Sequence, residues 1–255
     1  MLNTIIHGDC LRVMKDIPDS FIDLTVTSPP YDNLRTYNGF VFDFEGIAQE
    51  LYRVTKPGGV VVWVVGDATI KGSETGTSFR QALYFKEIGF NLHDTMIYEK
   101  ENPMPLSHNR YEQHFEYMFI FGRNKPRSFN PILRTNKDFG KRKGGTFRHE
   151  GKSTQAKHLN NTTKRTSIKG NIWSYSVGKG GSTSDQVAFV HPAIFPEQLA
   201  EDHIISWSNP GDIVLDPMCG SGTTCKMAVK TDRQYIGIDI SEEYCEIARK
   251  RTSDN

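Results

Sequence analysis

A buried strand that stops at two consecutive prolines is the strongest constraint on how this chain can fold. Residues 21–26 form a short run rich in apolar and β-branched side chains, which predicts a strand inside the protein. The segment Thr27-Ser28-Pro29-Pro30-Tyr31 follows directly. Neither proline can donate a hydrogen bond to a sheet and each fixes its own φ, so the strand must end in a rigid corner. Open α/β sheets bind their ligands at the carboxyl ends of strands.

This corner carries groups that suit an aromatic amine. Ser28 has a hydroxyl, the two prolines have carbonyls without a competing N–H, and Tyr31 has a flat ring. The same residue types are common in ordinary turns, so the segment alone leaves both interpretations open.

Apolar patterns alternate between strands and helices along the rest of the chain. Strands are expected at 3–7, 60–65, 91–100, 114–121, 213–216 and 235–239, and helices at 11–15, 44–54, 77–88, 196–207, 222–229 and 242–250. Such alternation predicts an α/β fold with a mostly parallel, Rossmann-like sheet and helices on both faces.

Charge divides the chain into an acidic body and a basic insert. Residues 123–181 contain fifteen Lys and Arg and two acids, a net charge of +13, although the whole chain has a net charge of only +1. Apolar periodicity is also lost there. We therefore expect a basic, loop-rich insert at 123–187, with 1–122 and 188–255 forming the main domain. A polyanion, and nucleic acid first, is the expected partner.

Composition disfavours several classes of protein. No stretch approaches the ~20 apolar residues of a membrane span, and the N-terminus lacks the charged and apolar regions of a signal peptide. The four cysteines form no CxxC pair, so neither a zinc site nor a disulfide framework is indicated. A cytoplasmic protein that makes no membrane contact is expected.

A glycine-rich turn between a strand and a helix is the second motif. It comprises Asp216, Pro217, Met218, Cys219, Gly220, Ser221, Gly222, Thr223 and Thr224. It matches neither a Walker loop nor a complete GxGxxG fingerprint. About twenty residues beyond this turn, the next strand ends at Asp239 and Ile240, where a carboxylate suits the hydroxyls of a ribose. The pattern favours a nucleoside-containing cofactor.

These motifs together resemble those of the β group of amino-methylating DNA methyltransferases, which use S-adenosylmethionine. Residues 216–222 resemble the family's cofactor loop, 28–31 its catalytic tetrapeptide, 8–10 its adenine-contacting turn, and 191–199 its element beside the methionine end of the cofactor. Their order is that of the circularly permuted methyltransferase fold. Met218 stands where the family usually has Phe, and it can pack against the same ligand.

The resemblance implies a role for each candidate residue. The catalytic residues would be Ser28, Pro29, Pro30 and Tyr31. The S-adenosylmethionine site would comprise Asp9, Cys10, Ser28, Phe195, Pro196, Asp216, Met218, Cys219, Gly220, Ser221, Gly222, Thr223, Thr224, Asp239 and Ile240. Within it, Asp239 would hold the ribose and Asp9 the adenine amino group. No metal is implied.

The reaction that the resemblance implies is methylation of an exocyclic amine on a DNA base. Ser28 Oγ and the Pro29 carbonyl would accept the two N–H groups, and Tyr31 would stack on the base, which must be flipped out of the duplex. In the family, serine in this tetrapeptide mostly accompanies cytosine N4 and aspartate adenine N6. Cytosine N4 is therefore favoured and adenine N6 is the alternative, ahead of RNA methylation or a non-catalytic nucleic-acid-binding role.

The basic insert would supply affinity for double-stranded DNA through its phosphates and would recognise the target. The candidate contacts are Lys141, Arg142, Lys143, Arg148, Lys164 and Arg165. The resemblance extends to partners, namely a second copy in a homodimer and a cognate restriction endonuclease. It also extends to location, a prokaryotic cell in which the protein associates with the nucleoid through DNA.

Overall fold

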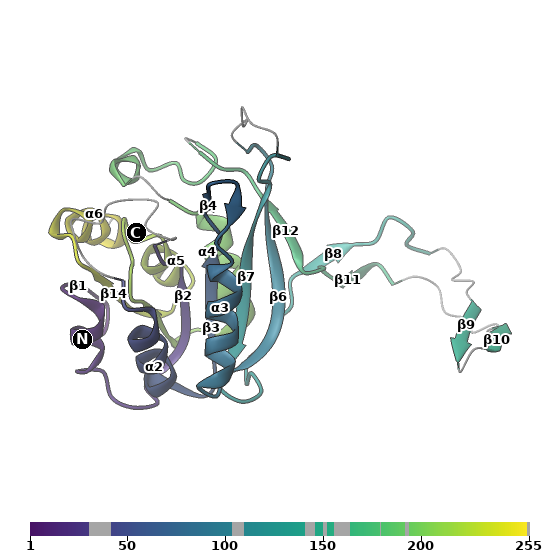
Figure 1. The fold of residues 1–255 in the computed structure, drawn as a ribbon, viewed down its shortest axis with the longest axis horizontal. Coiled ribbons are helices and arrows are strands. Elements are labelled where there is room, and N and C mark those ends of the chain that lie inside the picture. Colours follow the sequence, from purple (N-terminus) through teal and green to yellow (C-terminus); the bar gives the residue numbers. More distant parts are fainter. Residues whose placement is uncertain are drawn as a thin grey trace. The chain divides into compact units, whose positions relative to one another are not determined.

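A mixed sheet with the strand order β1-β14-β13-β2-β3-β7-β6-β12 organises most of the chain in the computed structural model (Figure 1). The structure describes residues 1–30, 42–103, 110–140, 146–149, 152–155, 164–178, 180–191 and 194–253, with only the backbone at 146–149 and 152–155. The strands are β1 (Thr4–His7), β2 (Ile22–Thr27), β3 (Thr55–Val65), β6 (Asn91–Lys100), β7 (Phe115–Gly122), β12 (Ile172–Tyr175), β13 (Ile213–Asp216) and β14 (Gln234–Asp239).

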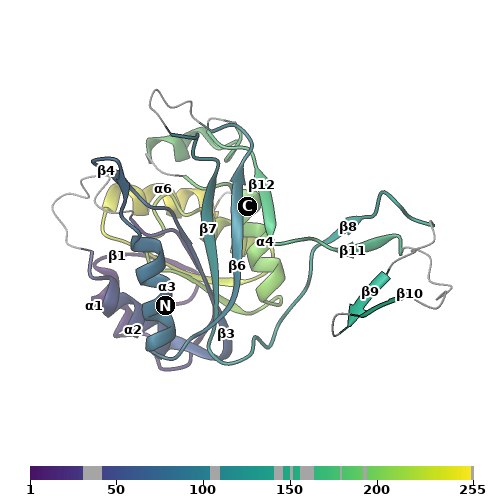
Figure 2. The same cartoon turned by 45° about the vertical axis from the view of Figure 1, so that its right-hand side comes forward.

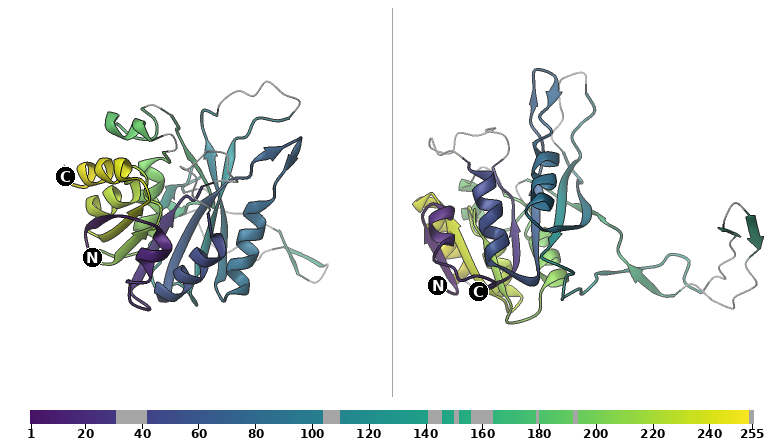
Figure 3. Two further views of the ribbon diagram at one scale, coloured as in Figure 1. Left: turned by 60° about the vertical axis from the view of Figure 1, so that its left-hand side comes forward. Right: turned by 60° about the horizontal axis from the view of Figure 1, so that its bottom comes forward.

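Neighbouring strands of this sheet are parallel except at β7, which runs antiparallel to both β3 and β6. The helices are α1 (Cys10–Met14), α2 (Phe44–Val54), α3 (Thr77–Glu87), α4 (Glu197–Trp207), α5 (Thr223–Lys230) and α6 (Glu242–Ser253), with a 3-10 helix η1 (Gln186–Val190). Helices α1–α3 cover one face of the sheet and α4–α6 the other (Figure 3). This arrangement confirms the predicted α/β fold with a mostly parallel, Rossmann-like sheet.

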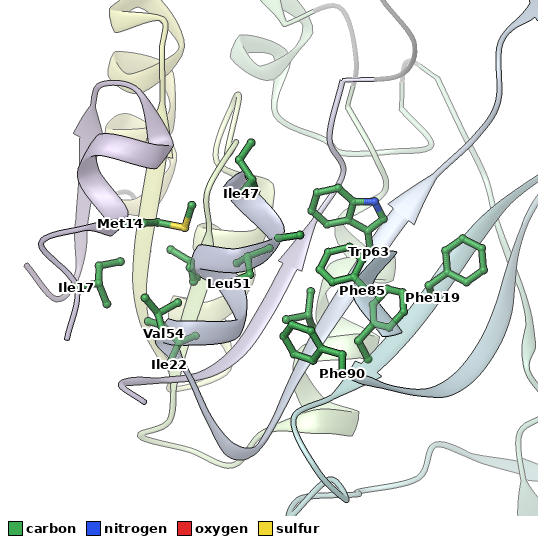
Figure 4. Packing of buried hydrophobic residues seen from close by; sticks show 14 of the residues in the cluster. Met14, Ile17, Ile22, Ile47, Leu51, Val54, Trp63, Phe85, Phe90 and Phe119 are labelled. Atoms are coloured by element: carbon green, nitrogen blue, oxygen red, sulfur yellow. The ribbon is translucent and has the colours of Figure 1, made fainter. Parts of the chain in front are cut away.

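The core beneath α1–α3 is built from alternate residues of the strands. Val61, Trp63 and Val65 of β3 belong to this core, because side chains two apart point to the same face of a strand. Phe85 of α3 packs on Trp63 with ring centroids 5.2 Å apart and on Phe121 of β7 at 4.4 Å (Figure 4). Continuous burial of 60–65 follows from cover on both faces. No helix among the described residues is long and apolar enough to cross a membrane.

Strand β3 begins earlier than predicted, because residues 55–59 continue it instead of ending in a turn. Its pairing with β2 shifts register there, from Ile22 opposite Thr55 to Leu24 opposite Val60. Gly58 takes a positive φ of 84° at this irregularity. A bulge accommodates the Pro-Gly-Gly sequence within a strand.

The chain divides by its contacts into two units, Met1–Asn130 with Asn171–Asn255, and Pro131–Gly170. The predicted insert at 123–187 therefore includes segments that pack in the first unit. The largest difference is β12, which pairs with β6 in parallel at the edge of the main sheet (Figure 2). Its Trp173 and Tyr175 are buried, and Tyr175 Oη donates a hydrogen bond of 2.7 Å to Asp202 of α4.

The second unit contains two short antiparallel pairs among its described residues. Strand β8 (Leu133–Thr135) pairs with β11 (Thr166–Ile168), and β9 (Thr146–His149) pairs with β10 (Lys152–Gln155). A further small hairpin, β4 (Thr69–Ile70) with β5 (Ser73–Glu74), belongs to the first unit.

Candidate active site

The two predicted motifs meet at the carboxyl edge of the sheet. They follow β2 and β13, which are parallel neighbours, so their loops leave the sheet side by side. Thr27 is the last residue of β2 and Asp216 the last residue of β13. Thr27 Oγ1 donates a hydrogen bond of 2.7 Å to Asp216 Oδ1. Thr224 Oγ1, in the first turn of α5, donates to the Val26 carbonyl at 3.0 Å. The predicted juxtaposition of the serine–proline corner and the glycine turn is confirmed.

The serine–proline corner is partly accessible. Pro29 is buried, whereas Ser28 and Pro30 are half-buried. Tyr31 lies outside the described residues. Pro29 is therefore packed into the protein, while its neighbours on both sides keep part of their surface exposed.

Two glycines of the turn are required by close packing. Gly220 has a φ of 48°, and a Cβ built there would lie 2.8 Å from Nε2 of His191. Gly222 has a φ of 80°, and its Cβ would lie 2.7 Å from the Cβ of Ala248 in α6. The backbone of the turn lies so close to His191 and α6 that a side chain would not fit at either position. The positive φ angles also favour glycine at both.

Asp216, the first residue of the glycine-rich turn, is a fully buried carboxyl that contacts the end of β2. Burial raises its pKa from 3.8 to about 6, although hydrogen bonds donated by Thr27 Oγ1 and Met218 N, and the neighbouring Thr224 hydroxyl, oppose the rise. Repulsion from nearby Asp239 is a smaller cause of the same rise. Asp216 thus joins both loops through hydrogen bonds and carries a proton more readily than an ordinary aspartate.

Asp239 ends β14 and fixes the glycine turn from the other side. Its Oδ2 accepts from Gly220 N at 2.8 Å and its Oδ1 from Ser241 N at 2.9 Å. Burial raises its pKa, while these backbone donors lower it. Each carboxylate oxygen has a further lone pair, so the group can still accept from a ligand hydroxyl.

The turn at residues 8–10 follows the neighbouring strand β1. His7 of β1 lies opposite Asp239, and Gly8 N donates to the Asp239 carbonyl at 2.9 Å. The exposed Asp9 caps α1 by accepting from Arg12 N at 3.1 Å. Cys10 is half-buried, and burial raises its pKa to about 12, so its thiol keeps its proton.

The remaining predicted cofactor residues lie within the glycine turn or at positions 195, 196 and 240. Pro196 is the buried N-cap of α4, and Phe195, Met218 and Ile240 are half-buried. The others, Cys219, Ser221, Thr223 and Thr224, are buried. The predicted roles of all these residues in binding stay predictions.

A buried arginine behind the glycine turn was not among the predicted site residues. The Arg251 side chain, 1% exposed, donates from Nη1 to the Ser221 carbonyl at 2.6 Å and to Thr223 Oγ1 at 3.3 Å. It also pairs with Asp185 at 3.0 Å and Glu197 at 2.6 Å. One guanidinium therefore connects the glycine turn to η1 and α4.

Lys226 of α5 completes this cluster of two cations and two anions. Its Nζ lies 2.7 Å from Asp185 Oδ2 and 2.9 Å from Glu197 Oε1. Burial raises the pKa of both carboxyls, but hydrogen bonds lower it on balance. Asp185 accepts these bonds from Lys226 and Arg251, and Glu197 accepts them from Thr183 and Lys226. The sequence signal was a charge on the apolar stripe of α6, three residues beyond the buried Ala248, which is itself three beyond Cys245.

The predicted DNA contacts lie in the second unit or outside the described residues. Lys164 and Arg165 are exposed, and Arg148 lies in β9, where the backbone alone is described. The segment 141–143 is outside the described residues. No group of three or more His, Cys, Asp or Glu in the described ranges is placed to hold a metal ion, and the cysteines are free.

Comparison with known proteins identifies the family. The family model described as DNA methylase, of the N6 and N4 type, matches residues 22–250. The orphan methyltransferase M.BamHII of Bacillus amyloliquefaciens is 60% identical over 240 residues, covering 93% of this chain and 91% of that protein. The chain belongs to the DNA methylase family.

Solved structures share the fold. PvuII DNA methyltransferase (cytosine-N4-specific) aligns with a TM-score of 0.74 at 22% identity, covering 97% of this chain and 85% of that one. The M1.HpyAVI–SAM complex aligns with a TM-score of 0.64 at 24% identity, covering 98% of each chain.

The raised pKa of Asp216 makes stability depend on pH. The folded state holds this proton up to about pH 6 and the unfolded state only up to about 3.8, so stability is lost as pH rises through this interval. Asp216→Asn keeps the acceptor oxygen and removes the titration. From pH 5 to pH 8, the unfolding free energy of the variant should rise by about 1.4 kcal/mol relative to wild type, as measured by urea denaturation. A pH-independent difference would contradict it.

Removal of the buried guanidinium should destabilise the protein strongly. Arg251→Met leaves two carboxylates with one cation, which typically costs about 3–5 kcal/mol. Arg249→Met is the matched control, because Arg249 lies on the same helix, is 43% exposed and pairs with the exposed Glu242. Chemical denaturation should show a large loss for the first variant and little change for the second; equal effects would contradict a special role for Arg251.

Proposed function

We propose that this chain transfers the methyl group of S-adenosylmethionine to the exocyclic N4 amine of a flipped-out cytosine in DNA. The observation that carries the proposal is the Thr27–Asp216 hydrogen bond, which joins the ends of two neighbouring parallel strands. It brings a corner suited to an amine and a turn suited to a nucleoside to one edge of the sheet.

The residues at this edge fit the proposed cofactor. The adjacent strands β1, β14 and β13 are followed by or end in Asp9, Asp239 and Asp216, which provide acceptors for the amine and hydroxyl donors of a nucleoside. When bound, S-adenosylmethionine supplies an electrophilic methyl group. Asp239 would accept from the ribose and Asp9 from the adenine amine. The remaining contacts would come from Cys10, Ser28, Phe195, Pro196, Asp216, Met218, Ile240 and residues 219–224.

The serine–proline corner would position the amine without a strong base. The lone pair of an exocyclic amine is delocalised into the ring, so the nitrogen is a poor nucleophile. Ser28 Oγ and the Pro29 carbonyl would accept its two N–H groups, drawing the nitrogen toward tetrahedral geometry. Pro30 would keep the corner rigid, and Tyr31 would stack on the base. The methylated amine is acidic enough to lose its proton to solvent, so catalysis rests on orientation and electrostatics.

Ser28 supports cytosine as the target base. A hydroxyl can accept from the amine and also donate toward a ring nitrogen, whereas a carboxylate can only accept. Adenine N6 presents the same pair of groups and is the alternative substrate. The predicted insert at 123–187 would hold the DNA, with Lys141, Arg142, Lys143, Arg148, Lys164 and Arg165 as its proposed contacts.

The identity of the product tests the proposed function. The protein is incubated with radiolabelled S-adenosylmethionine and genomic DNA, RNA or protein, and the DNA is digested to nucleosides for chromatography and mass spectrometry. We expect label in DNA as N4-methylcytosine. Label as N6-methyladenine would assign the alternative base, and label in RNA or protein alone would refute the proposal.

Ser28→Ala should separate catalysis from cofactor binding. Loss of one acceptor misorients the amine, so turnover should fall about 100-fold or more. The affinity for S-adenosylmethionine, measured by calorimetry, should survive. Ser73→Ala, an exposed serine of β5, is the control and should leave both quantities unchanged. If turnover and cofactor affinity fell together in Ser28→Ala, the catalytic assignment of the corner would be wrong.

A further inference from the structure

The β8–β11 pair in the second unit is a short ribbon with two different faces. Leu133 lies opposite Ile168, Arg134 opposite Ser167, and Thr135 opposite Thr166. Side chains alternate between the faces of a strand. One face therefore carries Leu133, Ile168 and the threonines, and the other carries Arg134 and Ser167.

Hydrogen bonds continue the polar face beyond the two strands. Asn136 N donates to the Arg165 carbonyl at 2.9 Å, which places Asn136 two residues after Arg134 on the same side. Lys169 N donates to the Ile132 carbonyl at 2.8 Å at the other end. The ribbon is thus longer than its strand bounds and presents a row of polar groups.

A chain of side-chain hydrogen bonds fixes the arginine on this face. Arg134 Nε donates to Ser167 Oγ at 3.3 Å, and Ser167 Oγ donates to Asn136 Oδ1 at 2.8 Å. Asn136 Nδ2 donates in turn to the Lys164 carbonyl at 2.9 Å. Both ends of the Asn136 amide are therefore used within the chain, so that Asn136 and Ser167 support Arg134.

The bond from Nε orients the guanidinium for recognition. Arg134 is exposed, and its bond to Ser167 uses only Nε. Among the described residues, nothing accepts a hydrogen bond from its two terminal nitrogens, which can therefore bind a ligand. A guanidinium held in this way offers two parallel N–H donors, the arrangement that pairs with O6 and N7 of guanine in the major groove.

The surroundings of the ribbon favour DNA as its partner. Described residues 131–140 and 164–170 contain five cations, Arg134, Lys137, Lys164, Arg165 and Lys169, and one acid, Asp138. Leu133 and Ile168 are 58% and 55% exposed, and a two-stranded ribbon has little stability of its own. The major groove admits such a ribbon.

We propose that the β8–β11 ribbon enters the major groove of DNA and that Arg134 reads one guanine of the recognised sequence. Ser167 and Asn136 are positioning residues for Arg134. Lys137, the residue after Asn136, contacts phosphate. The proposal rests on the proposed function and adds to it the residue that determines part of the target sequence.

The test compares discrimination between sequences with general affinity for DNA. Wild-type protein first methylates plasmid DNA, and sequencing that detects methylated bases gives the recognised sequence. The ratio kcat/KM is then measured on a duplex with that sequence and on duplexes that each carry one base-pair substitution. The variants are Arg134→Lys, which keeps the charge but loses the fork, Ser167→Ala, and Lys137→Ala as the control.

Arg134→Lys should lower kcat/KM on the recognised sequence by about tenfold or more and abolish discrimination at one G·C pair. Discrimination at the other positions and low-salt affinity for unrelated DNA should persist. Ser167→Ala should weaken the same discrimination partially. Lys137→Ala should reduce binding to all duplexes alike and flatten its dependence on salt.

Three results would overturn the proposal while leaving the methyltransferase activity established. These are a recognised sequence with no G·C pair besides that of the methylated base, unchanged discrimination in Arg134→Lys, and an equal loss on every duplex in that variant. Failure of the wild-type protein to methylate DNA would instead remove the proposed function and the ribbon's role with it.

Discussion

The parallel pairing of β2 with β13 is the constraint on which the candidate site depends. The two strands are six and four residues long, and each delivers one loop to the same edge. Because side chains alternate along a strand, a slip of one residue would turn Asp216 away from Thr27. Gly237, opposite Asp216 in the neighbouring β14, allows α5 to pack closely on the sheet, since a Cβ there would lie 2.7 Å from Cys225 Sγ.

The charge cluster around Arg251 makes the glycine turn part of a larger rigid assembly. It connects α6, α5, the start of α4 and the segment at η1 through two cations and two carboxylates. Removing charges from water is costly, and such clusters are stable only when each group keeps its partners. The cluster therefore favours one arrangement of these elements over others with similar apolar burial.

Local sequence patterns predicted most of the fold and the meeting of the two motifs. Helix 44–54 and strand 91–100 match their predicted bounds, because apolar periodicity is a property of neighbouring residues. The place of β12 could not be predicted in this way, since its partner β6 lies about seventy-five residues earlier. Asp23 is a similar case. It sits buried in β2 because Lys56 and Arg127 pair with it from outside the strand.

Dependence on distant contacts also explains why Arg251 was not predicted as part of the site. The role of Arg251 depends on Asp185, Ser221 and Glu197, which approach it from three other segments of the chain. No periodicity within α6 specifies those partners. The roles proposed for 28–31 and 216–224 came instead from residue chemistry and motif order. Both can be recognised in a sequence without knowledge of distant contacts.

In the sequence, the second unit lies between β7 and β12, two strands on the same side of β3 in the strand order. Its first and last neighbours are anchored in the first unit, Asn130 to α4 and Asn171 to β6. The strands that bear the two motifs, β2 and β13, lie on the other side of β3. Replacement of 131–170 by a different segment would thus leave the contacts between β2 and β13 intact. Under the proposed role of the β8–β11 ribbon, such a replacement would change the recognised sequence without altering that edge.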